Sequence, residues 1–348
     1  DSFKGYGKLS HFNIEELKAG AGQRSENDPL KKNQLDFTLW FSTSKFKGHV
    51  LKWPSPWGEG YPGWHIECSA MSMKYLSEAF KDNKFNPRAF ETIDIHSGGE
   101  DNMFPHHEAE IAQSEGATGK KFVNYWLHIK FLIINSEKMG KSLGNFFTLD
   151  DLLGKYSVQS IRYILLATQY RQSLNFLVDN LPGAQKTIDR LNELISKLQS
   201  IENKTENEKL NENSPEIQKS SSDFSELIGK TENDFESAMD DDLNTPLALS
   251  KLFDFVSKTN SLIDENKISK KNAANALMFL KKVNSVLNVM SFEQAQIALP
   301  PEIMTLIEQR EQMRKQKDFA GADLIRKQLL EKGIQLIDSK DSVKWKKI

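Results

Sequence analysis

The spacing of apolar positions divides the chain into an alternating part and a helical part. Up to about residue 135, short apolar runs such as 93–95 and 126–134 stand between helical patterns and Gly-rich loops. The pattern predicts a strand over Ile93–Ile95, then a loop, then a helix with Pro105 in its first turn. This order and spacing are typical of a doubly wound parallel sheet. Such sheets bind ligands at the carboxyl ends of their strands.

After about residue 150 the strand signals nearly vanish. Apolar residues recur every three or four positions in four stretches, which predicts the amphipathic helices of a bundle. The stretches are 157–170, 183–200, 244–264 and 274–290. A polar stretch, 201–222, predicts a loop between two of these helices. Beyond the two prolines at 300 and 301, the pattern predicts one helix-turn-helix unit and a small hairpin.

These patterns predict the domain organisation of the chain. Residues 1–35 are polar and are interpreted as a linker, the remnant of a connecting insertion. A sheet-containing domain is expected over 36–155, a helical bundle over 156–298, and a small α+β domain over 299–348.

Composition and charge narrow the class of protein. The chain has 38% hydrophobic and 27% charged residues and no run of about 18 apolar residues, so we expect no membrane-spanning segment. One cysteine leaves no internal disulfide and is typical of a cytoplasmic protein. The net charge is -2, but residues from 301 onward carry eleven Lys/Arg against eight Asp/Glu, which favours an anionic partner there. The sequence begins without Met, and we expect further residues to precede it.

Three residues have side chains that bind zinc in proteins. His106 and Glu110 are four positions apart and therefore share one face of the predicted helix. With the single cysteine, Cys68, they offer a thiolate, an imidazole and a carboxylate, all zinc donors. Spacing alone also fits an exposed helical pair and a cysteine in a core, so both interpretations stay open.

Two loops have the composition of phosphate-binding segments. In HSGGED (96–101), Gly98 and Gly99 would let the backbone approach a sugar or phosphate, and Asp101 could accept from ribose hydroxyls. The alternative is a tight loop with no ligand. In KMGKS (138–142), Lys138 and Lys141 could bind a polyphosphate, or they could be ordinary solvated lysines.

Four stretches, taken together and in this order, resemble the cysteinyl-tRNA synthetase family. They are WPSPWGEGYPGWHIECSAMS (53–72), FPHHEAEIAQSE (104–115), EKMGKSLGN (137–145) and AMDDDLNTP (238–246). The resemblance implies the C-terminal half of a Rossmann-type α/β catalytic domain, then an all-α helical bundle that contacts tRNA, then a small α+β anticodon-binding domain. The family's His-Ile-Gly-His motif and second zinc cysteine are absent from this chain, so we expect an incomplete copy of the enzyme.

The resemblance also implies a reaction. The family activates L-cysteine with ATP and Mg²⁺ to cysteinyl-adenylate and transfers it to the 3′ end of tRNA(Cys). One zinc ion, held in part by Cys68, His106 and Glu110, would bind the substrate thiolate. A metal–sulfur bond would favour cysteine over serine. A ten-thousandfold preference corresponds to a difference of about 5.6 kcal/mol in binding free energy, which such a bond can supply. Trp64 and His96 would bind the cysteine, and His65 and Glu67 would support them.

KMGKS matches the family's KMSKS loop, with Gly140 in place of the usual serine. Charge builds on the phosphates of ATP in the transition state, where a mobile cationic loop contributes. The resemblance implies this role first for Lys141 and second for Lys138, and Ser142 is kept.

The last fifty residues resemble the family's anticodon-reading domain. Arg314, Asp323 and Asp338 could read base edges, and Phe319 or Trp345 could stack on an unstacked base. A helix salt bridge or a core aromatic residue is the alternative for each.

Three other classes of protein remain as alternatives to a monomeric enzyme that binds tRNA(Cys), L-cysteine and ATP. A cysteine-activating ligase with a non-tRNA acceptor would leave 300–348 unexplained. A zinc hydrolase would leave KMGKS unexplained. A non-catalytic tRNA-binding module, left after proteolysis or deletion, would differ from the enzyme in the mass of the chain compared with its open reading frame.

Overall fold

The computed structural model describes residues 3–12, 31–33, 36–42, 48, 50–134, 136–140, 147–203, 215–293, 301–316, 318–338 and 343–347. These residues form two compact units, 1–290 and 291–348. None of the helices in the described part of the chain is long and apolar enough to cross a membrane.

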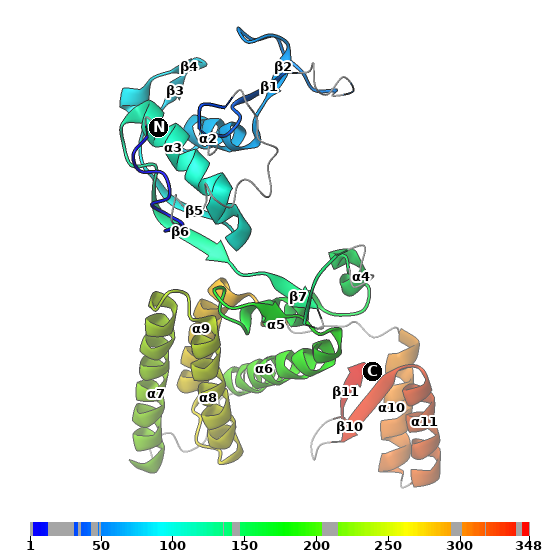
Figure 1. The fold of residues 1–348 in the computed structure, drawn as a ribbon. Helices are drawn as coiled ribbons and strands as arrows, with labels where there is room; N and C mark the ends of the chain where they lie inside the picture. The colour runs from blue at the N-terminus through cyan, green and yellow to red at the C-terminus, as the bar shows by residue number, and fades with distance from the viewer. Residues whose placement is uncertain are drawn as a thin grey trace. The chain divides into compact units, whose positions relative to one another are not determined.

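A parallel strand pair organises the first part of unit 1. β5 (Ile93–Gly99) pairs in parallel with β6 (Val123–Ile129), and α3 (Glu108–Thr118) connects them (Figure 1). This β-α-β arrangement confirms the predicted parallel sheet. The smaller elements of this part are β1 (Trp40–Ser42), β2 (Gly60–Pro62), α2 (Trp64–Tyr75), β3 (Phe80–Lys81), β4 (Lys84–Phe85), η1 (Pro87–Ala89), η2 (Glu100–Asn102) and η3 (Met103–His107).

The core of this part lies where α2, α3 and the two parallel strands meet. Its central side chains are all at most 6% exposed: Met73, Phe90, Ile93, Ile111 and Phe122. Phe3 and Leu9 pack against the same core. Residues 3–12 therefore belong to this part of the fold, which differs from the linker that their polar composition predicts.

Two local predictions here need correction. β5 extends four residues beyond the predicted end, to Gly99, because its ladder with β6 continues through both glycines, with Gly98 opposite His128. Pro105 follows a cis peptide bond and lies in the π-helical turn η3, so it precedes α3 and is not in its first turn.

A second small sheet begins the remainder of unit 1. β7 (Leu132–Ile134) pairs antiparallel with β8 (Glu137–Lys138) and parallel with β9 (Leu174–Asn175). α4 (Leu149–Leu153), α5 (Val158–Leu166) and η5 (Val178–Asn180) accompany this sheet. Leu132 and Leu174 pack against a cluster formed by Ile161, Ile164, Phe176 and Leu181, so the sheet and the following helices share one core.

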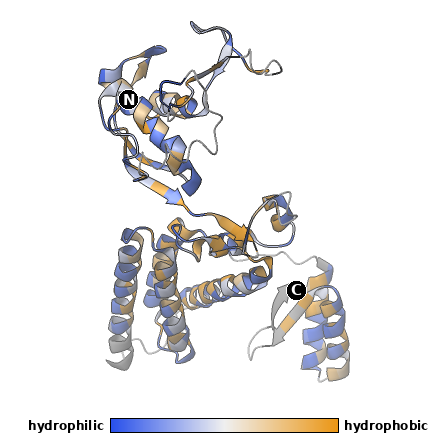
Figure 2. Ribbon diagram, in the orientation of Figure 1, coloured by the Kyte–Doolittle hydropathy of each residue, from blue (hydrophilic) through white to orange (hydrophobic). Residues whose placement is uncertain are grey.

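Four long helices then form a bundle: α6 (Leu181–Glu202), α7 (Pro215–Asp240), α8 (Thr245–Asp264) and α9 (Lys270–Leu287). The stretches 183–200, 244–264 and 274–290 predict α6, α8 and α9, and 157–170 predicts α5, but no stretch predicts α7. α7, α8 and α9 lie side by side (Figure 1), and hydrophobic and hydrophilic residues alternate along α6 and α8 (Figure 2). Leu194, Leu252 and Phe255 are almost fully buried in the bundle. The predicted loop 201–222 is too long, since α6 ends at Glu202 and α7 begins at Pro215.

Unit 2 has the predicted order of elements. α10 (Pro301–Lys315) and α11 (Phe319–Glu331) are followed by the antiparallel hairpin of β10 (Ile334–Asp338) and β11 (Val343–Lys347). Its own core consists of Ile303, Ile325, Leu329, Ile334 and Leu336.

Candidate metal centre and active site

Two helices bring the three candidate zinc ligands together. Cys68 lies on α2, His106 in η3 and Glu110 in the first turn of α3. One donor atom from each lies within 4.8 Å of the other two. His106 is 5% exposed and Glu110 is fully buried. The cluster is therefore neither an exposed helical pair nor an isolated core cysteine.

Among the residues that the structure describes, none forms a hydrogen bond with the Glu110 carboxylate. Both of its oxygens are buried, and burial raises its pKa to about 8. The nearest imidazole nitrogen, Nε2 of His96, lies 3.4 Å from its Oε2. That imidazole does not form an ion pair, because burial lowers its pKa and keeps it neutral. A buried carboxylate without a partner is unfavourable, and a cation would compensate it.

The surroundings of His106 keep its imidazole neutral, as a metal ligand must be. Burial, followed by the nearby His65 and His96, lowers its pKa to about 4, so the ring keeps a lone pair at neutral pH. Its Nδ1 lies 2.7 Å from Nδ1 of His65, which leaves Nε2 as the atom that can bind a metal.

Cys68 completes the donor set. Burial, then the charges of Glu110 and Glu67, raise the pKa of its thiol. A bound cation would reverse this effect and favour the thiolate. One sulfur, one imidazole and one buried carboxyl group, which a bound cation would keep ionised, fit a zinc ion.

A second group of donors shares Glu110. His96, His107 and Glu110 also place one donor atom each within 4.8 Å. Nδ1 of His107 lies 2.8 Å from Nε2 of His128, and burial lowers the pKa of His107 to about 3. Sequence reasoning missed His107 and His128. The available signals were the position of His107 three residues before Glu110 and the place of His128 on the strand after the helix.

Trp64 and His96, the predicted cysteine-binding residues, both border this cluster. The Trp64 ring stacks on His106 with centroids 4.2 Å apart, and it remains 58% exposed. Its other neighbours line an open pocket of about 310 Å³: Phe41, Leu51, Trp53, Tyr61, Pro62 and Glu67. His96 packs between Trp126 and His107, each with its ring centroid 4.8 Å away.

Packing explains why glycine occupies positions 98 and 99 of HSGGED (96–101), whereas the sequence predicted that these glycines let a sugar or phosphate approach the backbone. A Cβ atom at Gly98 would lie 2.8 Å from Cε1 of His107, and one at Gly99 would lie 2.5 Å from Oδ1 of Asp101. Glycine at 98 thus lets His107 approach β5. The nucleotide contacts of Gly98, Gly99 and Asp101 remain a prediction.

The KMGKS loop is described only at its start. Lys138 ends β8, paired with Ile133 of β7, while Lys141 and Ser142 lie outside the described residues. In unit 2, Nη1 of Arg314 lies 4.0 Å from Oε1 of Glu311, and Phe319 and Asp323 are exposed on α11. Asp338 and Trp345 occupy β10 and β11, and their side chains lie outside the described part.

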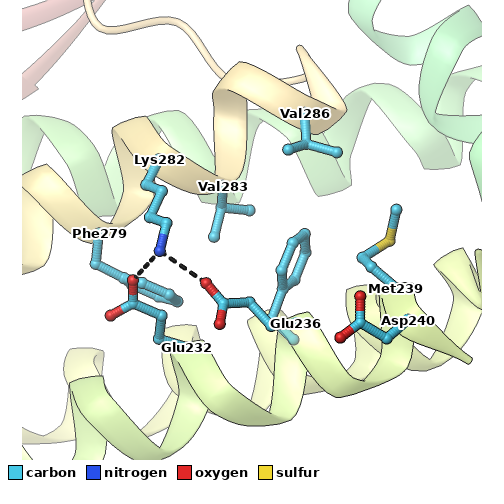
Figure 3. A pocket seen from close by; sticks show the side chains of 9 residues that line it. Glu232, Glu236, Met239, Asp240, Phe279, Lys282, Val283 and Val286 are labelled. Carbon is cyan, nitrogen blue, oxygen red and sulfur yellow. Dashed lines mark hydrogen bonds and ion pairs between the residues drawn. The ribbon is translucent and has the colours of Figure 1, made fainter.

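A further cavity, of about 270 Å³, lies between α7 and α9 and is unrelated to the predicted site residues (Figure 3). Its floor is apolar, and Nζ of Lys282 at its edge lies 2.5 Å from Glu232 and 2.7 Å from Glu236.

Comparison with known proteins connects this geometry to a family. Residues 1–186 match the family model for the class I (C) tRNA synthetase catalytic domain, and residues 234–291 match the DALR domain. A solved structure described as LeuRS from Agrobacterium radiobacter K84, in a ternary complex with tRNA and LeuAMS, aligns with a TM-score of 0.50 at 14% identity. The alignment covers 68% of this chain and 32% of that one, and at this identity it shows the fold alone.

Two relatives are similar over nearly the whole chain, and both are named Cysteine--tRNA ligase. The protein from Brachyspira hyodysenteriae is 42% identical over 353 residues, which cover 99% of this chain and 69% of the relative. The protein from Protochlamydia amoebophila is 38% identical over 349 residues, which cover 100% and 67%. Together with the matched catalytic domain and the cluster around Glu110, these similarities lead to one conclusion: the chain belongs to the cysteine–tRNA ligase family of class I synthetases.

Proposed function

We propose that this protein activates L-cysteine with ATP and transfers the cysteinyl group to the 3′ end of tRNA(Cys). The observation that carries the proposal is the convergence of Cys68, His106 and the unpartnered Glu110 in a chain of this family. The relatives named as tRNA ligases match over 99% and 100% of the chain, which favours tRNA over another acceptor.

Cys68, His106 and Glu110 would hold one zinc ion. When bound, zinc supplies selectivity, because a thiolate is a far better zinc ligand than a hydroxyl. Trp64, stacked on His106, would close one side of the cysteine pocket, and His96 would orient the substrate. The lowered pKa of His96 and His106 keeps both rings neutral, so neither competes for the substrate's carboxylate.

The activation step requires positive charge around ATP. An oxygen of the cysteine carboxylate forms a bond to the α-phosphorus, and the bond to the leaving pyrophosphate breaks. Lys141 and Lys138, with Ser142, would stabilise the charge that develops on the phosphates, with Mg²⁺ bound to the nucleotide. Gly98, Gly99 and Asp101 would lie along the ATP.

Unit 2 would bind the anticodon region of the tRNA. Phe319 is 61% exposed, as a residue that stacks on an unpaired base must be. Arg314 and Asp323, with Asp338 and Trp345 on the hairpin, would complete the contact. We propose that the protein acts as a monomer in the cytoplasm.

The test compares cysteine with serine as the substrate for ATP–pyrophosphate exchange in the intact protein. The expected result is cysteine-dependent exchange and a preference of roughly ten-thousandfold in kcat/KM, since sulfur and oxygen differ in their affinity for zinc. Metal content measured on the same protein supplies an independent readout. Comparable rates for the two amino acids would refute the metal-based selectivity.

A further inference from the structure

The turn between α7 and α8 has an unusual backbone. Asp242 and Leu243 both have positive φ, 53° and 54°, a region that residues other than glycine rarely adopt. Backbone hydrogen bonds hold this turn, from Leu243 N to Met239 O at 3.0 Å and from Asn244 N to Ala238 O at 3.0 Å. An unfavourable backbone conformation persists where the surrounding structure fixes it, and such turns often serve function.

The turn directs the Asp242 carboxylate onto residues 169–171. The Tyr170 hydroxyl donates to its Oδ1 at 2.7 Å, and Nη2 of Arg171 lies 2.5 Å from its Oδ2. The Gln169 side-chain amide donates to both Oδ2 and the Asp242 carbonyl at 3.3 Å. The hydrogen bond from Tyr170, then Arg171, lowers the pKa of Asp242, so it is ionised at neutral pH. Charge-assisted hydrogen bonds of this kind fix geometry well.

Residues 169–171 in turn hold the sheet that carries Lys138. The Tyr170 carbonyl accepts a hydrogen bond from Lys130 N at 2.9 Å, two residues before β7. β9 follows this segment and pairs in parallel with β7, and Oδ1 of Asn175 accepts from Ser136 N at 3.1 Å. β7 pairs with β8, which places Lys138 opposite Ile133. The contacts thus run from the bundle turn to the strand that begins the KMGKS loop.

We infer that Asp242 is a positioning residue for the activation step: it fixes the strand pair β7–β8, and with it the start of the KMGKS loop, through Tyr170 and Arg171. Asp242 touches no substrate. This inference rests on the proposed function, because the step that it would slow is the activation of cysteine by ATP.

The experiment uses Asp242→Asn, Tyr170→Phe and the double variant in the intact protein. We expect each single variant to lower kcat of cysteine-dependent ATP–pyrophosphate exchange at least about tenfold while KM for cysteine changes less than about twofold. Because the two side chains act through one contact, the double variant should be no slower than the worse single variant. Asp241→Asn is the matched control: it removes the same charge one residue earlier, where the side chain is exposed and, among the described residues, accepts a hydrogen bond at 3.4 Å from the side-chain amide of Asn244.

A second measurement reports whether strands β7 and β8 are held in place, and it requires no enzymatic activity. Amide hydrogen exchange over 132–138 should speed up in Asp242→Asn and Tyr170→Phe and stay unchanged in Asp241→Asn. Unchanged kcat and unchanged amide exchange in Asp242→Asn would overturn the inference, and so would a rise in KM for cysteine equal to the fall in kcat. A wild-type protein with no exchange activity would instead refute the proposed function, so the two failures are distinguishable.

Discussion

At the scale of single residues, Glu110 links the chemistry of the site to its physical environment. Its carboxylate is buried among His96, His106 and His107, whose nearest nitrogens lie 3.4 to 4.0 Å from Oε2. All three rings are neutral because burial lowers their pKa. No protein group in the described part of the chain therefore balances the charge of an ionised Glu110, and a bound cation would.

Replacing Cys68, the proposed sulfur ligand, tests whether a zinc ion binds at this cluster. Cys68→Ser should weaken zinc binding at least about tenfold, because a hydroxyl is a poor zinc ligand and loss of a thiolate removes a large part of the binding free energy. The measurement is a competitive zinc titration with a chromogenic chelator, which requires no activity.

Met71→Ser is the control for this substitution. It also removes a sulfur from α2, but at a position that is 52% exposed and outside the cluster. Equal zinc affinity in wild type and Cys68→Ser would remove Cys68 from the ligand set.

The sequence was sufficient to predict that Cys68, His106 and Glu110 lie together, and insufficient to predict which residues surround them. His106 and Glu110 share a helix, so their spacing predicts a common face, and the resemblance added Cys68. His107 and His128 come from different elements, and only the parallel register that sets Gly98 opposite His128 brings them together. A register of this kind depends on tertiary packing, which spacing along one segment does not contain.

At the scale of elements, α3 is tied to the start of the chain by one buried carboxylate. Glu108, fully buried in the first turn of α3, accepts from the backbone N–H groups of Gly7, Leu9 and Ser10 at 2.9, 2.5 and 2.7 Å. This contact explains why the polar residues 3–12 are part of the fold. Their composition predicts a linker because the partner that orders them is about a hundred residues away.

Glu108→Gln should destabilise this part of the protein by about 2 kcal/mol. The amide places an N–H₂ group against backbone donors and removes the charge that strengthens the bonds, leaving at least one buried donor unpaired. The change is measured as the free energy of unfolding in urea. Glu91→Gln, at an exposed position, controls for loss of a carboxylate and should change the free energy by less than about 0.5 kcal/mol.

Stability equal to wild type in Glu108→Gln would show that the contact between Glu108 and residues 7–10 is not needed to hold residues 3–12.

Regular periodicity made the other elements of the chain easier to predict. The helices α6, α8 and α9 repeat apolar residues over many turns. The first turns of α7 differ, because the seven residues after Pro215 are Glu-Ile-Gln-Lys-Ser-Ser-Ser and include one apolar side chain. Such a polar stretch predicts a loop and not a helix.

At the scale of the whole molecule, the chain consists of two compact units with separate cores. Among the described residues, the core cluster of unit 2 lies between 303 and 336, and the clusters around Phe122 and Ile161 in unit 1 include none of these residues. Because each unit has its own core, we expect unit 1 to fold when unit 2 is removed. Activation of cysteine and charging of tRNA, the two reactions proposed for the protein, can then be measured separately. The metal cluster, Lys138 and the contacts of Asp242 all lie in unit 1.

Removing residues 294–348 from the intact protein should therefore separate activation from tRNA charging. The cut leaves Val289 and Met290, which are buried and whose N–H groups both donate to Oδ1 of Asn284, in place at the end of α9. Cysteine-dependent ATP–pyrophosphate exchange should stay within about twofold of wild type, because the residues proposed for activation all belong to unit 1 and unit 2 has a core of its own. Charging of tRNA(Cys) should fall at least about tenfold in kcat/KM, because the proposed anticodon contact is lost. Phe319→Ala removes one exposed ring and keeps the unit, so a partial loss of charging in that variant would assign the effect to base stacking. If the truncation lowered exchange as much as charging, unit 2 would be needed for the catalytic part itself, and its proposed role as a tRNA-reading domain would be wrong.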